Sequence, residues 1–172
     1  MIIAFAGLAG SGKSTAAMHL VLRHGFKRIR FADPLKNMIR VLGLTDAEIE
    51  GDKKEQPCAL LCGKTPRAGM QTLGTEWGRD LMGSELWVRA WRHAVDKLPP
   101  YTDIVVDDCR FPNEVEAVRA AGGWIIRVVR NGAGQGAAGH SSEAQAFEVD
   151  STIYNDGSIE DFLRAVDVVW RS

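Results

Sequence analysis

Residues 1–25 read MIIAFAGLAGSGKSTAAMHLVLRHG, and this stretch decides the fold. Ile2–Ala6 is a short apolar run typical of a buried strand, and Ser14–Arg23 carries apolar residues at helical spacing. Between them, Gly7–Ser14 fits the pattern G-x-x-x-x-G-K-[ST]. Glycines between a strand and a helix let the backbone N–H groups point inward, and the helix N-terminus adds positive potential. The stretch therefore predicts a phosphate-binding loop and not merely a glycine-rich turn.

Two side chains of this loop carry chemistry. Lys13 supplies a mobile positive charge, and the Ser14 hydroxyl is a magnesium ligand in loops of this kind. Together with the inward N–H groups, they meet the needs of a bound triphosphate. The residues expected to hold it are Gly7, Ala9, Gly10, Ser11, Gly12, Lys13, Ser14 and Thr15.

A magnesium ion at such a loop also needs a carboxylate, usually at the end of a buried strand. Asp107 and Asp108 follow the apolar run Ile104–Val106 in that position. Successive strand residues point to opposite faces, so the sequence leaves open which of the two aspartates faces the metal. The alternative is that both only cap a helix that begins at Pro112.

Strand and helix signals alternate along the rest of the chain. Further strands are predicted at residues 28–31, 104–106, 124–129 and 151–154, and helices at 34–42, 45–50, 66–81, 85–98, 112–121 and 158–170. Asp33 and Ser158 are expected to cap their helices, and Ile159 to face inward. Five strands alternating with helices predict one α/β domain over residues 1–172, with a five-stranded parallel sheet flanked by helices.

The predicted helix that starts at Pro66 has two distinct faces. Its apolar residues fall on one stripe, and four polar residues follow each other at i+4 on a neighbouring arc. The stripe is Met70, Leu73, Trp77 and Leu81, and the arc is Arg67, Gln71, Thr75 and Arg79. Gly74 and Gly78 are unfavourable inside a helix, so they indicate close approach to this backbone, either by a ligand or by a neighbouring helix.

The predicted helix at 85–98 carries Trp87 and Trp91, which favour a role in the core. An aromatic helix buries itself either within one subunit or against a second one, so a homodimer is one of the two expectations.

Composition excludes several partners. With 21 Lys and Arg against 22 Asp and Glu, the net charge of −1 lacks the positive field of a non-specific nucleic-acid or membrane binder. The uncharged opening that ends at Gly12 is too short for a membrane helix. The odd set Cys58, Cys62 and Cys109 argues against a disulfide framework and for a reducing, cytoplasmic compartment. Cys58 and Cys62 lack the further ligands that a metal site needs.

The late strand is followed by Tyr154, Asn155, Asp156 and Gly157 in place of the Asn-Lys-x-Asp element of guanine-specific GTPases, which makes a GTPase switch the weaker interpretation.

Five further segments carry a family resemblance over nearly the whole chain. They are FADPLK at 31–36, TPR at 65–67, QTLGTEWGR at 71–79, DDCRFPNE at 107–114 and HSSE at 140–143. Together with the phosphate loop, they resemble the bacteriophage-type deoxynucleoside monophosphate kinases. The resemblance implies a P-loop nucleoside monophosphate kinase fold that holds ATP and Mg²⁺ on the loop and a deoxynucleoside monophosphate opposite. The products would be ADP and a deoxynucleoside diphosphate, made in the host cytoplasm if a phage encodes the enzyme.

The resemblance also assigns the acceptor to a helical region at about 33–98. Arg67 and Arg79 would clamp the acceptor phosphate, and Gln71 and Trp77 would lie near its base or sugar. Trp77 has a core position as its alternative, and Asp33 a helix cap. The full set of expected acceptor-binding residues is Asp33, Lys36, Arg67, Gln71, Thr75, Trp77, Arg79, Asp108, Glu114, His140 and Glu143.

A glycine-rich lid is expected at about 130–142, and residues 131–139 of it contain no arginine. The charge over the transferring phosphate must then come from Lys13 and Arg130, at the base of the lid, or from Arg127 beside the nucleotide. Arg110 is the remaining catalytic candidate, with pairing to Glu114 as its alternative.

Two other functions remain open at this point. A kinase for another small metabolite, such as dephospho-coenzyme A, would need a general base in the position of Asp33 if the acceptor were a hydroxyl group. A nucleotide-binding regulatory module would bind ATP without acceptor-dependent turnover.

Overall fold

The computed structural model describes residues 1–134 and 147–171. The chain forms two compact units. The first combines Met1–Arg30 with Ala94–Ser172, and the second is Phe31–His93. The predicted lid and the segment at 140–143 lie mostly outside the described residues.

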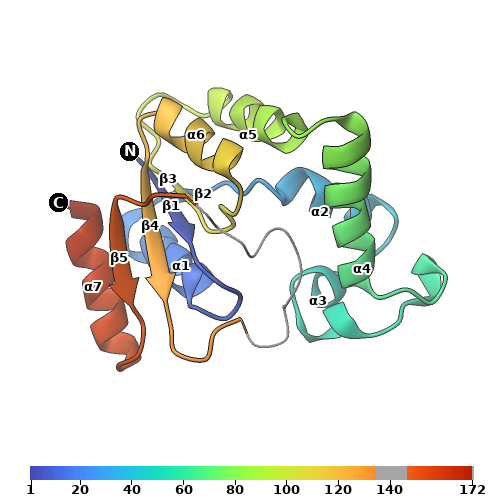
Figure 1. The fold of residues 1–172 in the computed structure, drawn as a ribbon, viewed down its shortest axis with the longest axis horizontal. Helices are drawn as coiled ribbons and strands as arrows, with labels where there is room; N and C mark the ends of the chain where they lie inside the picture. Colours follow the sequence, from blue (N-terminus) through green and yellow to red (C-terminus); the bar gives the residue numbers. More distant parts are fainter. Residues whose placement is uncertain (135–146, 172) are drawn as a thin grey trace. The chain divides into compact units, whose positions relative to one another are not determined.

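The first unit is built on a parallel sheet whose strands run in the order β2-β3-β1-β4-β5 (Figure 1). The strands are β1 (Ile2–Ala6), β2 (Lys27–Arg28), β3 (Ile104–Val106), β4 (Trp124–Val129) and β5 (Ser151–Tyr154). All four pairings are parallel, so the predicted five-stranded parallel sheet is confirmed. The second strand is shorter and earlier than predicted, because pairing with β3 ends near Ile29.

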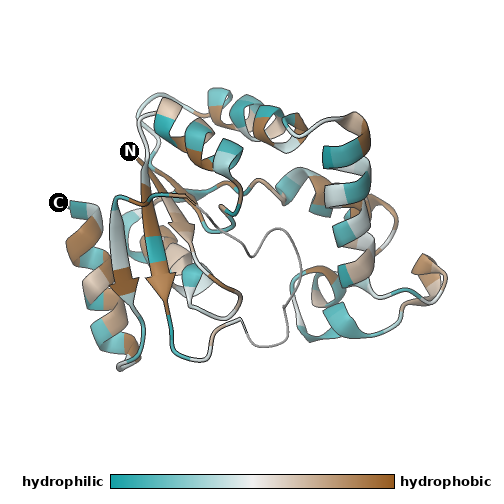
Figure 2. Ribbon diagram, viewed as in Figure 1, coloured by the Kyte–Doolittle hydropathy of each residue, from teal (hydrophilic) through white to brown (hydrophobic). Residues whose placement is uncertain are grey.

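Among the described residues, three helices belong to this unit, namely α1 (Lys13–His24), α6 (Pro112–Ala120) and α7 (Ile159–Arg171), together with the last three residues of α5 (Leu86–Asp96). The core joins Phe5, Leu20, Ile126 and Phe162. Figure 2 shows the strands at the centre of this unit coloured as strongly hydrophobic.

At the start of α7, one of two predictions is correct. Ser158 caps the helix as predicted, since its Oγ accepts a hydrogen bond from the backbone N–H of Asp161 at 3.1 Å. The prediction that Ile159 faces inward is wrong: 49% of it is exposed, and it lines a pocket instead of packing into the core.

The second unit is helical. It contains α2 (Asp33–Val41), α3 (Asp46–Ile49), the short turns η1 (Asp52–Glu55) and η2 (Ala59–Leu61), α4 (Pro66–Gln71), η3 (Thr72–Met82) and most of α5. Ile39, Leu44 and Ile49 form its small core, with Leu61, Met70 and Leu73 packed against it.

The predicted helix from Pro66 changes its winding at Thr72, where η3 adopts the wider π-helical turn. Because a π-helix bonds residue i to i+5, the i+4 arithmetic of the sequence no longer describes its faces. Leu81, predicted on the apolar stripe, is 78% exposed. The predicted apolar face is therefore correct at Met70 and Leu73, which pack against the core, and wrong at Leu81.

The two glycines of η3 are approached by a neighbouring helix. Trp87 on α5 donates its indole Nε1–H to the Gly74 carbonyl at 2.7 Å, and a Cβ on Gly78 would lie 2.5 Å from the Trp87 ring. Of the two explanations for these glycines, helix packing is the one that the structure bears out. Trp87 and Trp91 are 4% and 1% exposed within this single chain, so they give no support for a homodimer.

No helix among the described residues is both long and apolar enough to span a membrane.

Candidate active site

The loop between β1 and α1 has a backbone that only glycine adopts readily. Gly7, Gly10 and Gly12 have φ angles of 137°, 80° and 112°. The space around Gly7 also excludes any larger residue, since a Cβ there would lie 2.3 Å from the Val128 carbonyl oxygen. The loop is thus pressed between β4 and the start of α1.

Polar atoms of the loop point inward. The Lys13 ammonium donates to the carbonyl oxygens of Gly7 at 2.6 Å and Leu8 at 2.7 Å, and the residue is only 7% exposed. The buried Ser11 Oγ has no hydrogen-bond partner among the described residues. A buried hydroxyl without a partner is costly, so the loop retains donor capacity for a ligand.

Asp107, at the end of β3, is the strand-end carboxylate beside this loop. It is 4% exposed, accepts hydrogen bonds from Arg28 Nε at 2.9 Å and Nη2 at 2.5 Å, and accepts one from the Ser14 hydroxyl. Burial would raise the pKa of Asp107, but the bonds from Arg28 and Ser14 and the charges of Arg28 and Arg30 hold the pKa below its ordinary value. A carboxylate that is ionised at neutral pH therefore lies against the hydroxyl of the loop.

The alternative that both aspartates cap the helix at Pro112 is wrong. The N-cap of α6 is Phe111, and the buried Glu114 carboxylate accepts from the backbone N–H groups of Arg110 at 2.7 Å and Phe111 at 3.1 Å. The contact between Glu114 and Arg110 thus involves the backbone N–H of Arg110. The roles of Asp108 and Glu114 toward the acceptor, and of Arg110 in catalysis, remain predictions.

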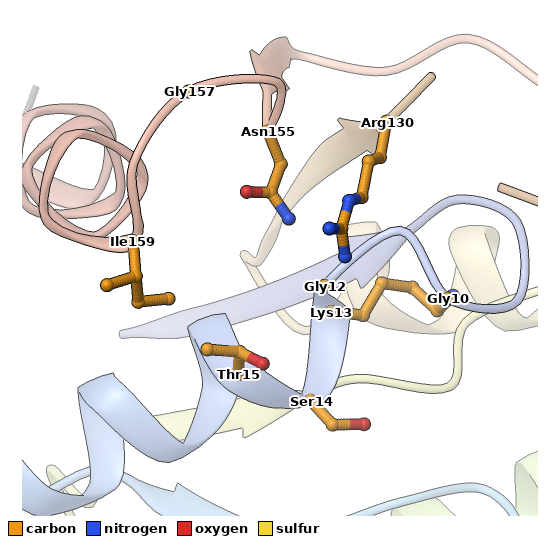
Figure 3. Close-up of a pocket in the computed structure, with 9 residues that line it drawn as sticks. All are labelled: Gly10, Gly12, Lys13, Ser14, Thr15, Arg130, Asn155, Gly157 and Ile159. Carbon is orange, nitrogen blue, oxygen red and sulfur yellow. The ribbon is translucent and has the colours of Figure 1, made fainter. Parts of the chain in front are cut away.

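A pocket of about 380 Å³ opens over the loop (Figure 3). Its lining comes from the loop and α1, from Arg130 after β4, and from the segment after β5, namely Gly10, Gly12, Lys13, Ser14, Thr15, Arg130, Asn155, Gly157 and Ile159. Figure 3 shows the Arg130 side chain extending toward Gly12. Of the two predicted arginines, Arg130 lines the pocket, whereas Arg127 donates to the Phe147 carbonyl at 2.9 Å.

Asn155 and Arg28 were not predicted as site residues. The Asn155 amide donates to the Ser11 carbonyl at 2.8 Å and fixes the loop from the far side. Its position directly after the β5 strand was a usable signal, because ligands of parallel α/β sheets bind at the carboxyl ends of strands. Arg28 carried no such signal, since its partner lies 79 residues away.

Seven of the predicted acceptor residues, from Asp33 to Arg79, lie in the helical unit, whereas Asp108 and Glu114 belong to the unit with the sheet. Arg67 forms an ion pair with Glu55, Lys36 donates to both Glu50 carboxylate oxygens at 3.0 and 2.8 Å, and Arg79 donates to the Ser84 carbonyl at 3.3 Å.

The neighbouring side chains of this set differ in exposure. Gln71 is exposed and Thr75 half-buried, while the Trp77 ring lies 6.2 Å from that of Trp87, which favours its core alternative. Asp33 is not the predicted cap, because Ala32 holds the N-cap position and Asp33 begins α2. His140 and Glu143 lie outside the described residues.

Lys54 is a third cation beside Lys36 and Arg67, and sequence reasoning missed it. Burial lowers the pKa of the Lys54 amine, and the charges of Lys36 and Arg67 lower it further, against the opposite effect of Glu50 and Glu55. In the sequence, Lys53 and Lys54 resemble a solvated charged pair, so nothing marked one of them.

Comparison with solved structures bears on the fold alone. The Mycobacterium tuberculosis APS kinase CysC, in complex with AMPPNP and APS, aligns with a TM-score of 0.50 and 18% identity over 99% of this chain and 97% of that one. A crystal structure from Thermus thermophilus aligns with a TM-score of 0.52 and 17% identity, over 99% and 96%. The predicted P-loop kinase fold is confirmed.

Sequence relatives bear on the family. A mimivirus protein (Acanthamoeba polyphaga mimivirus) named "Putative deoxynucleotide monophosphate kinase" is 33% identical over 96% of this chain and 94% of its own length. The deoxynucleotide monophosphate kinase of Escherichia phage RB69 is 34% identical over 59% of this chain and 43% of its own. Residues 65–166 match the family described as deoxynucleotide monophosphate kinase. This chain therefore belongs to the deoxynucleotide monophosphate kinase family, a family of transferases.

Proposed function

We propose that this chain transfers the γ-phosphoryl group of ATP to a deoxynucleoside monophosphate with the help of Mg²⁺, giving ADP and the diphosphate. The observation that carries the proposal is the contact between the Ser14 hydroxyl and the ionised Asp107 beside the glycine loop. These two oxygen ligands are hard donors of the kind that Mg²⁺ prefers.

The residues present fit a triphosphate. The positive-φ glycines leave no Cβ between the backbone and a ligand, and Ser11 Oγ offers an unused hydroxyl. Lys13 can exchange its two loop carbonyls for phosphate oxygens, which are stronger acceptors because they are charged. When bound, Mg²⁺ neutralises charge on the phosphates.

Arg130 supplies the second positive charge in the pocket, so Lys13 and Arg130 stabilise the charge that builds up on the transferring group. Arg127, which donates to the Phe147 carbonyl, is the other cation proposed beside the nucleotide.

The acceptor is assigned to the helical unit by its cations. Lys36, Lys54 and Arg67 lie close enough there for their charges to act on one another, beside Glu50 and Glu55, and Arg79 belongs to the same unit. A phosphate monoester has a second pKa of about 6, so its attacking oxygen is mostly ionised at neutral pH. No general base is required, and positioning with charge neutralisation suffices. The three free thiols fit the reducing cytoplasm of a cell in which deoxynucleotides are made.

The test is a coupled ADP-release assay with ATP and Mg²⁺ against each deoxynucleoside and ribonucleoside monophosphate, with dephospho-coenzyme A as a rival acceptor. We expect ADP release that depends on a deoxynucleoside monophosphate. Lys13→Ala should remain folded and lose on the order of 10² to 10³ in kcat. The matched control is Lys97→Ala, which removes an exposed lysine and should leave kcat unchanged. Tight ATP binding without turnover on any acceptor would overturn the proposal in favour of a regulatory module.

A further inference from the structure

A second group of titratable side chains lies outside the pocket, where α1 meets α7. His19 and His24 come from α1, and Asp167 comes from α7. The two imidazole Nε2 atoms lie 2.8 and 2.7 Å from the same carboxylate oxygen, Asp167 Oδ1. One ligand atom from each residue lies within 4.8 Å of the other two, which is the largest convergence of metal-ligating groups among the described residues.

The surroundings are those of a partly enclosed site. The side chains of His19, His24 and Asp167 are 12%, 16% and 31% exposed, so both imidazoles are mostly covered while the carboxylate stays accessible. Trp170 closes one side, since its ring lies 4.7 Å from the His24 ring and its Nε1 lies 3.4 Å from Asp167 Oδ1. Solvent can reach the remaining side.

The geometry is close to that of a coordinated ion. Zinc bonds to imidazole nitrogen and carboxylate oxygen are about 2.0–2.2 Å long, so two ligands at tetrahedral angles lie roughly 3.3–3.5 Å apart. The nitrogen–oxygen separations here are 2.8 and 2.7 Å. An ion would need them to widen by about 0.5–0.8 Å. The third separation, between the ligand nitrogens of the two imidazoles, is within 4.8 Å.

The charge state also suits a cation. An aspartate side chain ordinarily loses its proton at about pH 4, so Asp167 needs no hydrogen bond from the imidazoles to be charged at neutral pH. The carboxylate is thus ionised at neutral pH and offers a charged ligand.

We propose that His19, His24 and Asp167 bind one divalent cation of the zinc type, with water in the remaining coordination position. Two imidazoles and one carboxylate are the ligands that zinc accepts, whereas Mg²⁺ prefers oxygen ligands throughout. The site is therefore chemically distinct from the magnesium site of the proposed kinase reaction. Bound there, the ion ties the C-terminal end of α1, the helix that follows the glycine loop, to α7 and stabilises the folded chain.

The proposal is tested by titrating the metal-free full chain with ZnCl₂ in a calorimeter, in the presence of excess Mg²⁺. We expect one zinc ion per chain and a rise in the unfolding temperature on zinc addition. His24→Gln and Asp167→Asn should each weaken zinc binding by at least about tenfold, the loss that even an outer-shell change produces. Circular dichroism of both variants shows whether they are folded before the comparison is made.

Two controls separate this site from other zinc ligands. His93→Ala removes an exposed histidine of α5, and the double variant Cys58→Ser/Cys62→Ser removes the two cysteine thiols that are not buried; both should bind zinc like the unmodified chain. Cobalt substitution adds a direct signature, because an imidazole and carboxylate site lacks thiolate charge-transfer absorption. Unchanged zinc affinity in folded His24→Gln, or loss of binding in the cysteine variant, would overturn the proposal and leave the cluster as a hydrogen-bonded clamp.

Discussion

At the scale of single residues, Asp107 shows how a charge is kept in a nearly buried position. Its side chain is 2% exposed, and Arg28 is the charged group that compensates for its lost hydration. Replacing Arg28 by methionine keeps the bulk of the side chain and removes the compensation. We expect Arg28→Met to lower the free energy of unfolding by about 3 kcal/mol at pH 7, because a buried carboxylate is left unpaired.

The pH dependence of this loss has a definite sign. In the unmodified chain the folded pKa of Asp107 is below its ordinary value, so the stabilisation is present at neutral pH and is lost as pH falls below about 4. Without Arg28, burial raises the folded pKa, and the ionised carboxylate becomes destabilising as pH rises. Urea unfolding should therefore show a larger difference between the two proteins at pH 7 than at pH 4. A difference that is the same at both pH values would contradict this account.

Gly12 and Gly25 flank α1 and form a matched pair. Both have left-handed backbones, with φ of 112° and 73°, but a Cβ on Gly12 would meet the Asn155 amide at 2.5 Å whereas one on Gly25 meets nothing within 4 Å. Alanine at either site costs about 1–2 kcal/mol of backbone strain. Only Gly12→Ala should also raise the KM for ATP, by about tenfold, because it displaces the amide that holds the Ser11 carbonyl. Steady-state kinetics of both variants checks this, and equal KM values for ATP would refute it.

Sequence patterns predicted the phosphate-binding loop, but they did not predict the side chains that contact it from distant parts of the chain. The run Gly7–Ser14 is contiguous, so its function can be read from spacing alone. The contacts Arg28–Asp107 and Asn155–Ser11 join positions 79 and 144 residues apart. Only the three-dimensional sheet brings such residues together, which is also why strand alternation could not choose between Asp107 and Asp108.

At the scale of elements, the wide helix η3 and α5 show how packing selects glycine. Gly78 is buried against the Trp87 ring, with three ring atoms within 2.6 Å of a would-be Cβ, while the nearest atom to a Cβ on Gly74 is Leu35 Cδ2 at 3.3 Å. Gly78→Ala should destabilise the protein by about 2 kcal/mol, since the overpacked ring is held by its bond to the Gly74 carbonyl.

The neighbouring substitution is the control. Gly74→Ala meets only the end of a flexible leucine, and alanine is favoured over glycine by about 1 kcal/mol in a helix, so its stability should change by less than about 1 kcal/mol. Chemical denaturation of both variants gives the comparison. If Gly74→Ala were as damaging as Gly78→Ala, the close approach of Trp87 would not be the reason for these glycines.

Element types followed from the sequence wherever local signals agreed. Pro66 at the start of α4 and the capping Thr65, whose Oγ accepts the Ala68 N–H at 3.1 Å, mark that helix start clearly. The π-helical winding of η3 begins at Thr72, and nothing in the spacing of its apolar residues marks the change. An assumed α-helical period therefore misplaced Leu81 while correctly placing Met70 and Leu73.

At the scale of the whole molecule, the chain divides its cations between two units. Lys13 and Arg130 belong to the unit with the sheet, and Lys36, Lys54 and Arg67 belong to the unit Phe31–His93. Sequence patterns suggested one continuous domain with a helical region at about 33–98. They carry no information about where contacts within the chain become sparse, and this is what separates the units.

This division predicts that the KM values of the two substrates respond to separate substitutions. Arg67→Ala should raise the KM for the deoxynucleoside monophosphate by about 10- to 100-fold, equivalent to the 1.5–3 kcal/mol of a hydrogen bond to a charged group, and leave the KM for ATP within about twofold. Arg67→Lys should lie between the two, because lysine keeps the charge but not the two-pronged geometry. The control Arg92→Ala removes an exposed arginine of the same unit and should change neither KM.

The ion pair between Arg67 and Glu55 decides how the result is interpreted. If Arg67 only braces the short turn η1, then Glu55→Gln should harm the enzyme as much as Arg67→Ala does, and both KM values should rise together. If Arg67 binds the acceptor phosphate, Glu55 competes with that phosphate for the guanidinium group. Glu55→Gln should then leave the acceptor KM unchanged or lower it, because the phosphate no longer has to displace a carboxylate before it binds.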